Sequence, residues 1–414
     1  MLNRRSISTL VLAAALALSL PLAAQQIHCS EGNCLIDSRT YRDGNQWVQE
    51  LTGSIDAAKG VRISSAIGFI QVRGSSQPNV TFTIKKRVNR SSEEQARREL
   101  NVYAIRIVRK GEVVYVEGYW DGGHSNKLIS EFYINVPKET SMVKADTNGG
   151  SIGINSISGK AIAETSGGSI TLNDIGGSAS ASTSGGSISA GNMGGDVKLE
   201  TSGGSISIGN ISGHINANTS GGSIDVESGK KDVILETAGG SIRISQCSGS
   251  LIASTAGGSV DAGDVGGDAT LETAGGSIRL KSAKGAVTAT NQGGGIHLMR
   301  LTRGVRAETA AGSIEAEFIA SPSDFTESNL ETVAGDIIVY LPSDLPVTVK
   351  AGIELANGHS IRSDFPGLKI TSEGDKWGPK EIYAEGRLNG GGPVLKVHTT
   401  NGSIEFRKTS SSKH

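Results

Sequence analysis

The sequence predicts an all-β protein, a single-stranded parallel β-helix with about 18 residues per coil and capping elements at both ends. Three observations lead to this fold class. The phrase Thr-x-Gly-Gly-Ser-Ile recurs at intervals of about 18 residues through the middle of the chain. Each repeat contains two short stretches in which apolar and polar residues alternate, as they do in strands. Aromatic residues are absent from 137–317, so this segment lacks the bulky side chains of an ordinary globular core.

The N-terminus, residues 1–24, is expected to be a secretory signal peptide. Arg4 and Arg5 precede an apolar run over 10–20, and small residues lead to an expected cleavage site after Ala24. No later stretch approaches the roughly 20 apolar residues of a membrane-spanning helix. We therefore expect export to the periplasm, the outer surface or the medium, with no integral membrane segment after cleavage.

Export places the two N-terminal cysteines, Cys29 and Cys34, in an oxidising compartment, where they are candidates for a local structural disulfide. The formal net charge of the whole chain is −1. A chain so nearly neutral has no long-range attraction for nucleic acid or for an anionic membrane, so neither is an expected partner.

Residues 25–140 are expected to form a strand-rich N-terminal cap, because a solenoid leaves unpaired backbone at its ends. Alternating apolar and polar residues predict strands within 60–74, 79–88 and 112–120. The stretch SSEEQARREL, residues 91–100, predicts a short helix that begins at a serine cap followed by glutamate.

Residues 141–318 are expected to form regular coils. In the unit that starts at Thr201, apolar residues such as Ile206 and Ile215 fall on one side of two strands. Glycines lie between these strands, where chain reversal needs either positive φ or close backbone approach. The threonine beside the Gly-Gly pair is expected to be a turn residue that hydrogen-bonds along the stack. The phrase starts at ten positions with no insertion between them: Thr147, Thr165, Thr183, Thr201, Thr219, Thr237, Thr255, Thr273, Asn291 and Thr309.

Charge alternation favours a coil that holds one repeat over a coil that holds two. Asp225, Arg243, Asp261 and Arg279 occupy the same position in successive repeats. A coil of two repeats would stack like charges about 4.8 Å apart, whereas a coil of one repeat places each aspartate beside arginines. One inward position alternates in size in the same way, through Ala181, Leu199, Ala217, Leu235, Ala253 and Leu271. Cys247 shares a column with apolar residues and is expected to be a small buried hydrophobic residue.

Residues 319–408 are expected to form irregular C-terminal coils and a second cap, followed by a frayed tail at 409–414. A five-residue insertion precedes a further coil-like phrase that starts at Thr332. The motif is expected once more at Thr400–Ile404.

These features resemble the putative-adhesin family of bacterial β-helical domains, which is related to the autotransporter adhesin head domain. The likeness rests on the exported N-terminus, GFIQV at 68–72, the short glutamate-rich helix, the serial GGSI coils and GGGPVLKVHTTNGSIEF at 390–406. It covers roughly residues 59–408. The resemblance implies a right-handed winding and a cell-envelope or adhesive role, and it supplies no catalytic residue.

One charged column is the best candidate for chemistry. Asp196, His214, Asp232 and Asp268 occupy the same repeat position, and neighbouring coils are about 5 Å apart. Polysaccharide lyases and hydrolases need clustered carboxylates beside a groove, which this face would supply. The column continues through neutral Ser250 and Ala286 between its charged members, and stacking alone favours such alternation, which indicates a solvated structural ladder. A sugar- or cation-binding face is the alternative. We expect a candidate binding face and assign no catalytic residue.

The expected function is that of an exported, non-catalytic, adhesin-like or scaffolding β-solenoid of the bacterial cell envelope. Its polar flanks would make multivalent contact with a cell-surface glycan, peptidoglycan or an envelope protein. A polysaccharide-processing enzyme and a purely structural envelope protein are the alternatives. No metal or cofactor is expected, because the turns lack a regular calcium-ligating aspartate and the histidines lack zinc-like partners.

Overall fold

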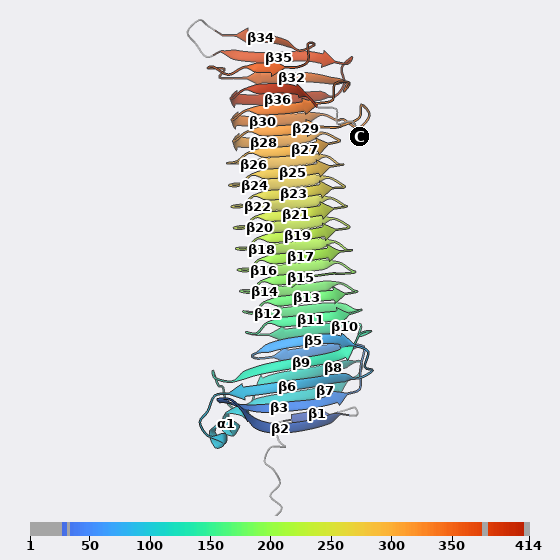
Figure 1. Ribbon diagram of the computed structural model, residues 1–414, viewed down its shortest axis with the longest axis vertical. Coiled ribbons are helices and arrows are strands. Elements are labelled where there is room, and N and C mark those ends of the chain that lie inside the picture. Colours follow the sequence, from blue (N-terminus) through green and yellow to red (C-terminus); the bar gives the residue numbers. More distant parts are fainter. Residues whose placement is uncertain (1–26, 31–33, 375–379, 410–414) are drawn as a thin grey trace, which may run out of the picture.

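The computed structural model describes residues 27–30, 34–374 and 380–409. The expected signal peptide and nearly all of the expected tail therefore lie outside the described residues. The described chain is a long rod of stacked strands, with the N-terminal strands at one end and the C-terminal strands at the other (Figure 1). One helix, α1 (Glu93–Leu100), packs at the N-terminal end.

The middle of the rod consists of two parallel sheets, to which the chain contributes one strand in turn. Sheet A contains β10 (Met142–Thr147), β12 (Lys160–Thr165), β14 (Ala179–Thr183), β16 (Val197–Thr201), β18 (Ile215–Thr219), β20 (Val233–Thr237), β22 (Leu251–Thr255), β24 (Ala269–Thr273), β26 (Val287–Asn291), β28 (Val305–Ala311) and β30 (Ser328–Ala334). Sheet B contains β11 (Ile152–Ile157), β13 (Ile170–Ile175), β15 (Ile188–Ala190), β17 (Ile206–Ile211), β19 (Ile224–Gly229), β21 (Ile242–Cys247), β23 (Val260–Val265), β25 (Ile278–Ala283), β27 (Ile296–Leu301), β29 (Ile314–Phe318) and β31 (Ile337–Leu341).

Each strand pairs with the equivalent strand of the next repeat. Ala161 pairs with Ala179 in sheet A, and Ile170 pairs with Ile188 in sheet B. One sequence repeat therefore contributes one strand to each sheet. Strands form here because alternate side chains are apolar and face the space between the two sheets, where they are buried.

The core is filled by side chains of alternating size. Leu199 lies between Ala181 and Ala217, and Leu235 lies between Ala217 and Ala253. All of these residues are buried. A large side chain therefore fills the space left by the small ones above and below it, as a close-packed interior requires.

Close backbone approach, rather than positive φ, explains the second glycine of the phrase in the regular coils. A Cβ at Gly168 would lie 2.0 Å from the carbonyl oxygen of Gly150 in the preceding coil, and at Gly204 it would lie 2.1 Å from that of Gly186. Neither glycine has φ in the left-handed region. Any larger residue would force neighbouring coils apart at this turn.

The N-terminal end departs from the simple order of coils. Its strands are β1 (Ile27–Ser30), β2 (Leu35–Asp43), β3 (Gln46–Ile55), β4 (Gly60–Ser65), β5 (Phe69–Ser75), β6 (Val80–Val88), β7 (Tyr103–Lys110), β8 (Val113–Trp120) and β9 (Ile129–Pro137). β4 and β5 form a coil whose one side pairs in parallel with β10 and β11. Their other side pairs in parallel with β8 and β9, which occur later in the chain. Antiparallel β7, β6, β3 and β2 then close the end.

The C-terminal end repeats this arrangement. Its strands are β32 (Val347–Ile353), β33 (Ile361–Ser363), β34 (Lys369–Glu373), β35 (Glu381–Leu388), β36 (Val394–Asn401) and β37 (Ile404–Lys408). β36 and β37 are last in sequence but stack directly on β30 and β31, and β32 and β33 lie beyond them. Thr399 pairs with Thr332, so the last phrase begins one residue before the expected Thr400.

Candidate functional site

The predicted charged column lies in the turns that lead into sheet A. Asp196 Oδ1 accepts a hydrogen bond from the backbone N–H of His214 in the next coil, at 2.9 Å. Asp232 Oδ1 accepts one from Ser250 at 2.9 Å, and Asp268 Oδ1 accepts one from Ala286 at 2.8 Å. Each aspartate therefore fastens its own turn to the turn that follows, through a backbone contact that the sequence alone did not specify.

The structure brings Asp196, His214 and Asp232 into three successive turns. His214 Nδ1 lies 3.7 Å from Asp232 Oδ2, and both side chains are about half exposed. Asp268 lies two coils beyond Asp232, with Ser250 in the turn between them. The column thus presents its aspartates singly, and each one is already bonded to backbone.

The threonines of the phrase point inward beside the Gly-Gly turn and are buried. Thr201 Oγ1 donates a hydrogen bond to the carbonyl of Gly186 at 2.8 Å and accepts one from the N–H of Gly204 at 3.3 Å. Asn291 replaces threonine in one coil. Its amide N–H donates to the carbonyl of Gly276 as a threonine would, and its Oδ1 accepts from the N–H of Gly293, one residue earlier than the N–H that bonds to threonine. The expectation that these threonines bond along the stack is confirmed.

The residue that precedes each of these threonines faces outward from sheet A and forms a continuous row, which we call the acid row. Glutamate recurs in it at every second regular coil, separated by short polar residues. By strand register the row consists of Ser64, Asp146, Glu164, Ser182, Glu200, Asn218, Glu236, Ser254, Glu272, Thr290 and Glu308, of which Ser64 precedes a serine and Thr290 precedes Asn291.

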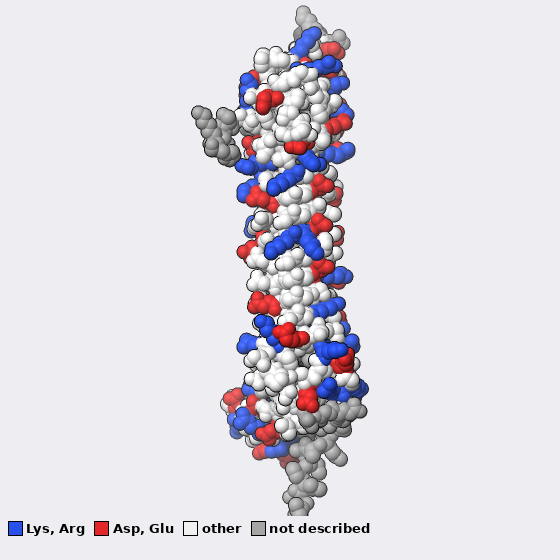
Figure 2. All heavy atoms as spheres, turned by 90° about the vertical axis from the view of Figure 1, so that its right-hand side faces the viewer, with Lys and Arg blue, Asp and Glu red and all other residues white. Residues whose placement is uncertain are grey.

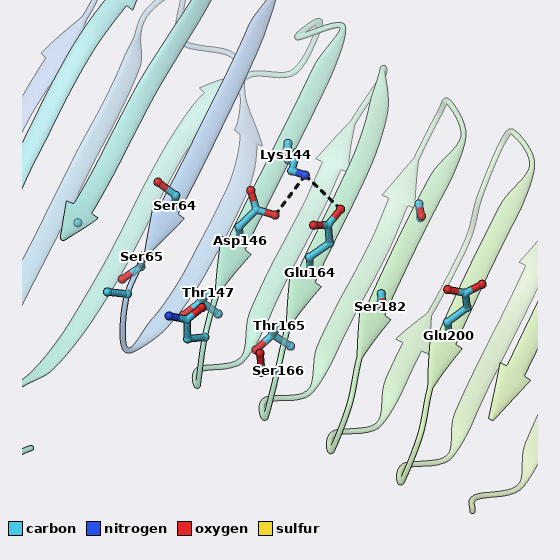
Figure 3. A pocket seen from close by; sticks show the side chains of 14 residues that line it. Ser64, Ser65, Lys144, Asp146, Thr147, Glu164, Thr165, Ser166, Ser182 and Glu200 are labelled. Carbon is cyan, nitrogen blue, oxygen red and sulfur yellow. Dashed lines mark hydrogen bonds and ion pairs between the residues drawn. The ribbon is translucent and has the colours of Figure 1, made fainter. Parts of the chain in front are cut away.

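A groove of about 730 Å³ follows the acid row where the N-terminal strands meet the regular coils (Figure 3). Lys144 Nζ lies between two carboxylates, 3.1 Å from Glu164 Oε1 and 3.5 Å from Asp146 Oδ1. Ser64, Ser182 and the row's Glu200 extend the lining along neighbouring strands.

Electrostatics in this groove favour the protonated forms of Asp146 and Lys144. Burial raises the pKa of the Asp146 carboxyl, and nearby Glu164 adds to the rise although Lys144 opposes it. The hydrogen bond to Glu164 raises the pKa of Lys144. The three groups therefore form a partly buried cluster with one cation and two acids at its centre, suited to binding polar groups rather than to nucleophilic attack.

A second shallow groove of about 570 Å³ follows the acid row through the middle coils, lined by Glu236, Glu272 and short polar or alanine side chains. On sheet B, Arg243 lies 3.8 Å from Asp225 and 3.9 Å from Asp261, and Arg279 lies 3.2 Å from Asp261. The predicted alternation of charge between neighbouring coils is thus confirmed. Figure 2 shows acidic and basic side chains interspersed along the rod.

The side chains of two cysteines, Cys34 and Cys247, lie within the described part of the chain. Cys34 is disulfide-bonded, and the side chain of Cys29, its expected partner, lies outside the described residues. Cys247 is a free thiol buried in the core, and burial raises its pKa. Across the described ranges, no cluster of three or more histidine, cysteine or acidic side chains is arranged to hold a metal ion. The described part of the chain also contains no helix of the length and apolarity needed to cross a membrane.

Comparison with known proteins gives weak structural likenesses only. No family model and no curated protein matches the chain. It is similar to a "putative adhesin" from Parabacteroides distasonis, with 12% identity, a TM-score of 0.27, and coverage of 76% of this chain and 100% of that one. A "putative cell adhesion protein" from Clostridium sporogenes has 11% identity, a TM-score of 0.17, and coverage of 91% and 100%. A "putative lipid binding protein" from Parabacteroides distasonis has 12% identity, a TM-score of 0.20, and coverage of 75% and 96%. We draw no conclusion about function from likenesses with such low identities and TM-scores.

Sequence reasoning missed the groove at the N-terminal end for an identifiable reason. Asp146 and Glu164 could be placed from the sequence, since both directly precede a threonine of the repeated phrase. Ser64 completes the lining from β4, which pairs with β10 although the two strands are far apart in the sequence. No periodic pattern connects Ser64 with its partner Asp146.

Proposed function

We propose that this protein is an exported, non-catalytic, adhesin-like or scaffolding β-solenoid of the bacterial cell envelope. Its coils, each of about 18 residues and wound in the right-handed sense that the family resemblance implies, present stacked polar faces. These faces contact a cell-surface glycan, peptidoglycan or another envelope protein. The signal-like N-terminus supports the exported location.

The observation that carries the proposal is the repetition of the same outward groups along the rod. The acid row places a carboxylate at every second regular coil, which corresponds to about 9.6 Å at the usual strand spacing. The grooves along this row are shallow and polar, so a single contact would be weak. Many equal contacts on one rigid rod convert weak binding into useful avidity, provided the partner is itself repetitive.

The charged column supports binding better than catalysis. Asp196, Asp232 and Asp268 each commit one carboxylate oxygen to the backbone of the next turn. A glycosidase needs two carboxyl groups placed across one bond, with one of them protonated. We therefore assign the column, with His214, to a polar binding face. A polysaccharide-processing enzyme and a purely structural protein remain the competing functions.

The test is to incubate the purified protein with bacterial and plant polysaccharides and with peptidoglycan, and to record both retention and product formation. If the wild-type protein binds through these charges, its retention is salt-sensitive. We expect retention without products, and weaker, less salt-sensitive retention for the double variant Asp196→Asn, Asp232→Asn, because it lacks two charged groups that salt would screen. Asparagine still accepts the backbone hydrogen bond, so the fold is preserved. Asp336→Asn is the matched control, because Asp336 Oδ1 accepts a similar bond from Ser403 at 2.7 Å.

Products that disappear in the double variant would establish an enzyme and overturn the proposal. An absence of both retention and products would favour the purely structural protein.

A further inference from the structure

The outer face of sheet A carries a distinctive arrangement at the C-terminal end of the rod. β36, β32 and β35 lie side by side there (Figure 1). Gly352 on the middle strand pairs with His398 on one side and with Tyr383 on the other. A glycine thus separates two rings on neighbouring strands. We call this feature the ring notch, formed by Tyr383, Gly352 and His398.

The geometry of the ring notch leaves space for one layer of atoms. A Cβ at Gly352 would lie 3.5 Å from Tyr383 Cδ1 and 3.5 Å from His398 Nδ1, which is ordinary van der Waals contact. Because Gly352 has no side chain, a ligand can approach the strand between the two rings, and a methyl group there would block that approach without displacing either ring. The rings remain accessible, since Tyr383 is 42% exposed, and the surrounding depression has a volume of about 450 Å³.

Charged side chains border the ring notch on both sides. Lys350 and Glu385 lie 3.6 Å apart along one side. On the other side, Glu354 Oε1 lies 3.3 Å from His398 Nε2, and the Tyr383 hydroxyl donates to Glu381. The border thus offers an ammonium donor and a carboxylate acceptor on one side, and carboxylate acceptors on the other.

We propose that the ring notch binds one uncharged pyranose ring of a glycan. The C–H face of the sugar lies against Tyr383 and His398, which present flat apolar surface. Its hydroxyl groups accept from Lys350 and donate to Glu354, because a hydroxyl is both donor and acceptor. Charges of both signs border the notch, so it is not built around a single sign of charge that would select a charged ligand.

This inference rests on the proposed function and sharpens it by naming the ligand class and a terminal site. The acid row would bind a polymer along the middle of the rod, whereas the ring notch binds a single sugar unit at the C-terminal end. An aromatic side chain of a partner protein is the competing occupant, since it would also fit between two rings.

The experiment measures binding of three neutral probes, cellotetraose, tetra-N-acetylchitotetraose and mannotetraose, by saturation-transfer NMR and titration calorimetry. Gly352→Ala fills the notch with a methyl group that clashes with nothing, and we expect it to weaken binding of the recognised probe by at least about tenfold. Gly60→Ala is the matched control, because its Cβ would also meet neighbours at 3.5 Å, at the far end of the rod. Tyr383→Phe retains the ring and should retain binding, whereas Tyr383→Ala should lose it.

Three results would overturn the inference: no probe binds the wild-type protein, Gly352→Ala binds as well as wild type, or N-acetyltryptophanamide displaces the sugar at equal concentration. None of these depends on retention by insoluble polysaccharide, which the Asp196 and Asp232 variants test separately. Retention without oligosaccharide binding would therefore reject the ring notch and keep the proposed function.

Discussion

At the scale of single residues, the repeated phrase is explained by what each of its positions contacts. The threonine bonds to the carbonyl of the coil before it, as Thr237 does to Gly222 at 2.7 Å. The second glycine lets the backbone of the neighbouring coil approach closely. The serine hydroxyl accepts a hydrogen bond from the N–H of the equivalent serine in the next coil, as Ser223 does from Ser241 at 3.2 Å. The threonine contacts could be predicted from the sequence, but the choice between positive φ and close approach needed coordinates.

Replacement of a phrase threonine by valine should destabilise the rod. Thr237→Val leaves the Gly222 carbonyl and the Gly240 N–H without their shared partner, so we expect a loss of about 1–3 kcal/mol in the free energy of unfolding. Thr237→Ser keeps the hydroxyl and should lose less. Denaturant unfolding measures both, and equal stability of valine variant and wild type would show that the contact is dispensable.

Lys86 gives the N-terminal cap a dependence on pH. Its side chain is buried, and Nζ donates to the carbonyls of Leu100 and Tyr103, each at 2.8 Å, close to the end of α1. Burial lowers the pKa of Lys86 from 10.5 to about 7. The unfolded chain therefore binds more protons than the folded one between these two values, and the cap should gain stability as pH rises from 7 to 10.5.

The comparison of wild type with Lys86→Met isolates this effect. The difference in unfolding free energy between them should change by on the order of 5 kcal/mol across the window, in favour of wild type at high pH. Below pH 7 the difference should become constant. A difference independent of pH would show that Lys86 is not neutral in the folded protein at high pH.

At the scale of elements, the coils are predictable and the ends are not. Charge alternates between Asp225 and Arg243, and side-chain size alternates between Ala181 and Leu199, because these residues are in contact in successive coils. The pairing of the coils could therefore be predicted from the sequence. At the ends, β4 pairs with β8 and β10, and β36 lies between β30 and β32. These partners are distant in sequence and carry no shared period, which is why composition indicated caps without their topology.

The two-coil period of the packing can be tested by deletion. Removal of 238–255 would stack Leu235 on Leu271 and Asp225 on Asp261, which combines overpacking with like-charge contact. Removal of 238–273 instead stacks Leu235 on Ala289 and Asp225 on Arg279. We expect the shorter deletion to lower the thermal midpoint much more than the longer one. Equal midpoints, or the opposite order, would show that alternation does not govern stacking.

At the scale of the whole molecule, the candidate sites differ in how far sequence could reveal them. Asp196, His214 and Asp232 were found because they share one repeat position, but their bonds to the following turn were not foreseen. The ring notch escaped detection because Gly352 and His398 come from strands brought together by the reordered C-terminal end. A sequence period reveals residues that occupy the same position in every coil. It does not reveal sites at the ends, because their residues come from strands outside the repeat.

The most direct test of the account is whether retention depends on the number of coils. The deletion of 238–273 keeps the packing alternation and removes two coils, including Glu272 of the acid row, while both ends are unchanged. Retention on the bound polysaccharide or peptidoglycan should fall at least several-fold relative to wild type, because each contact along the rod multiplies the overall affinity. A folded deletion variant that is retained as strongly as wild type would contradict multivalent binding along the shaft.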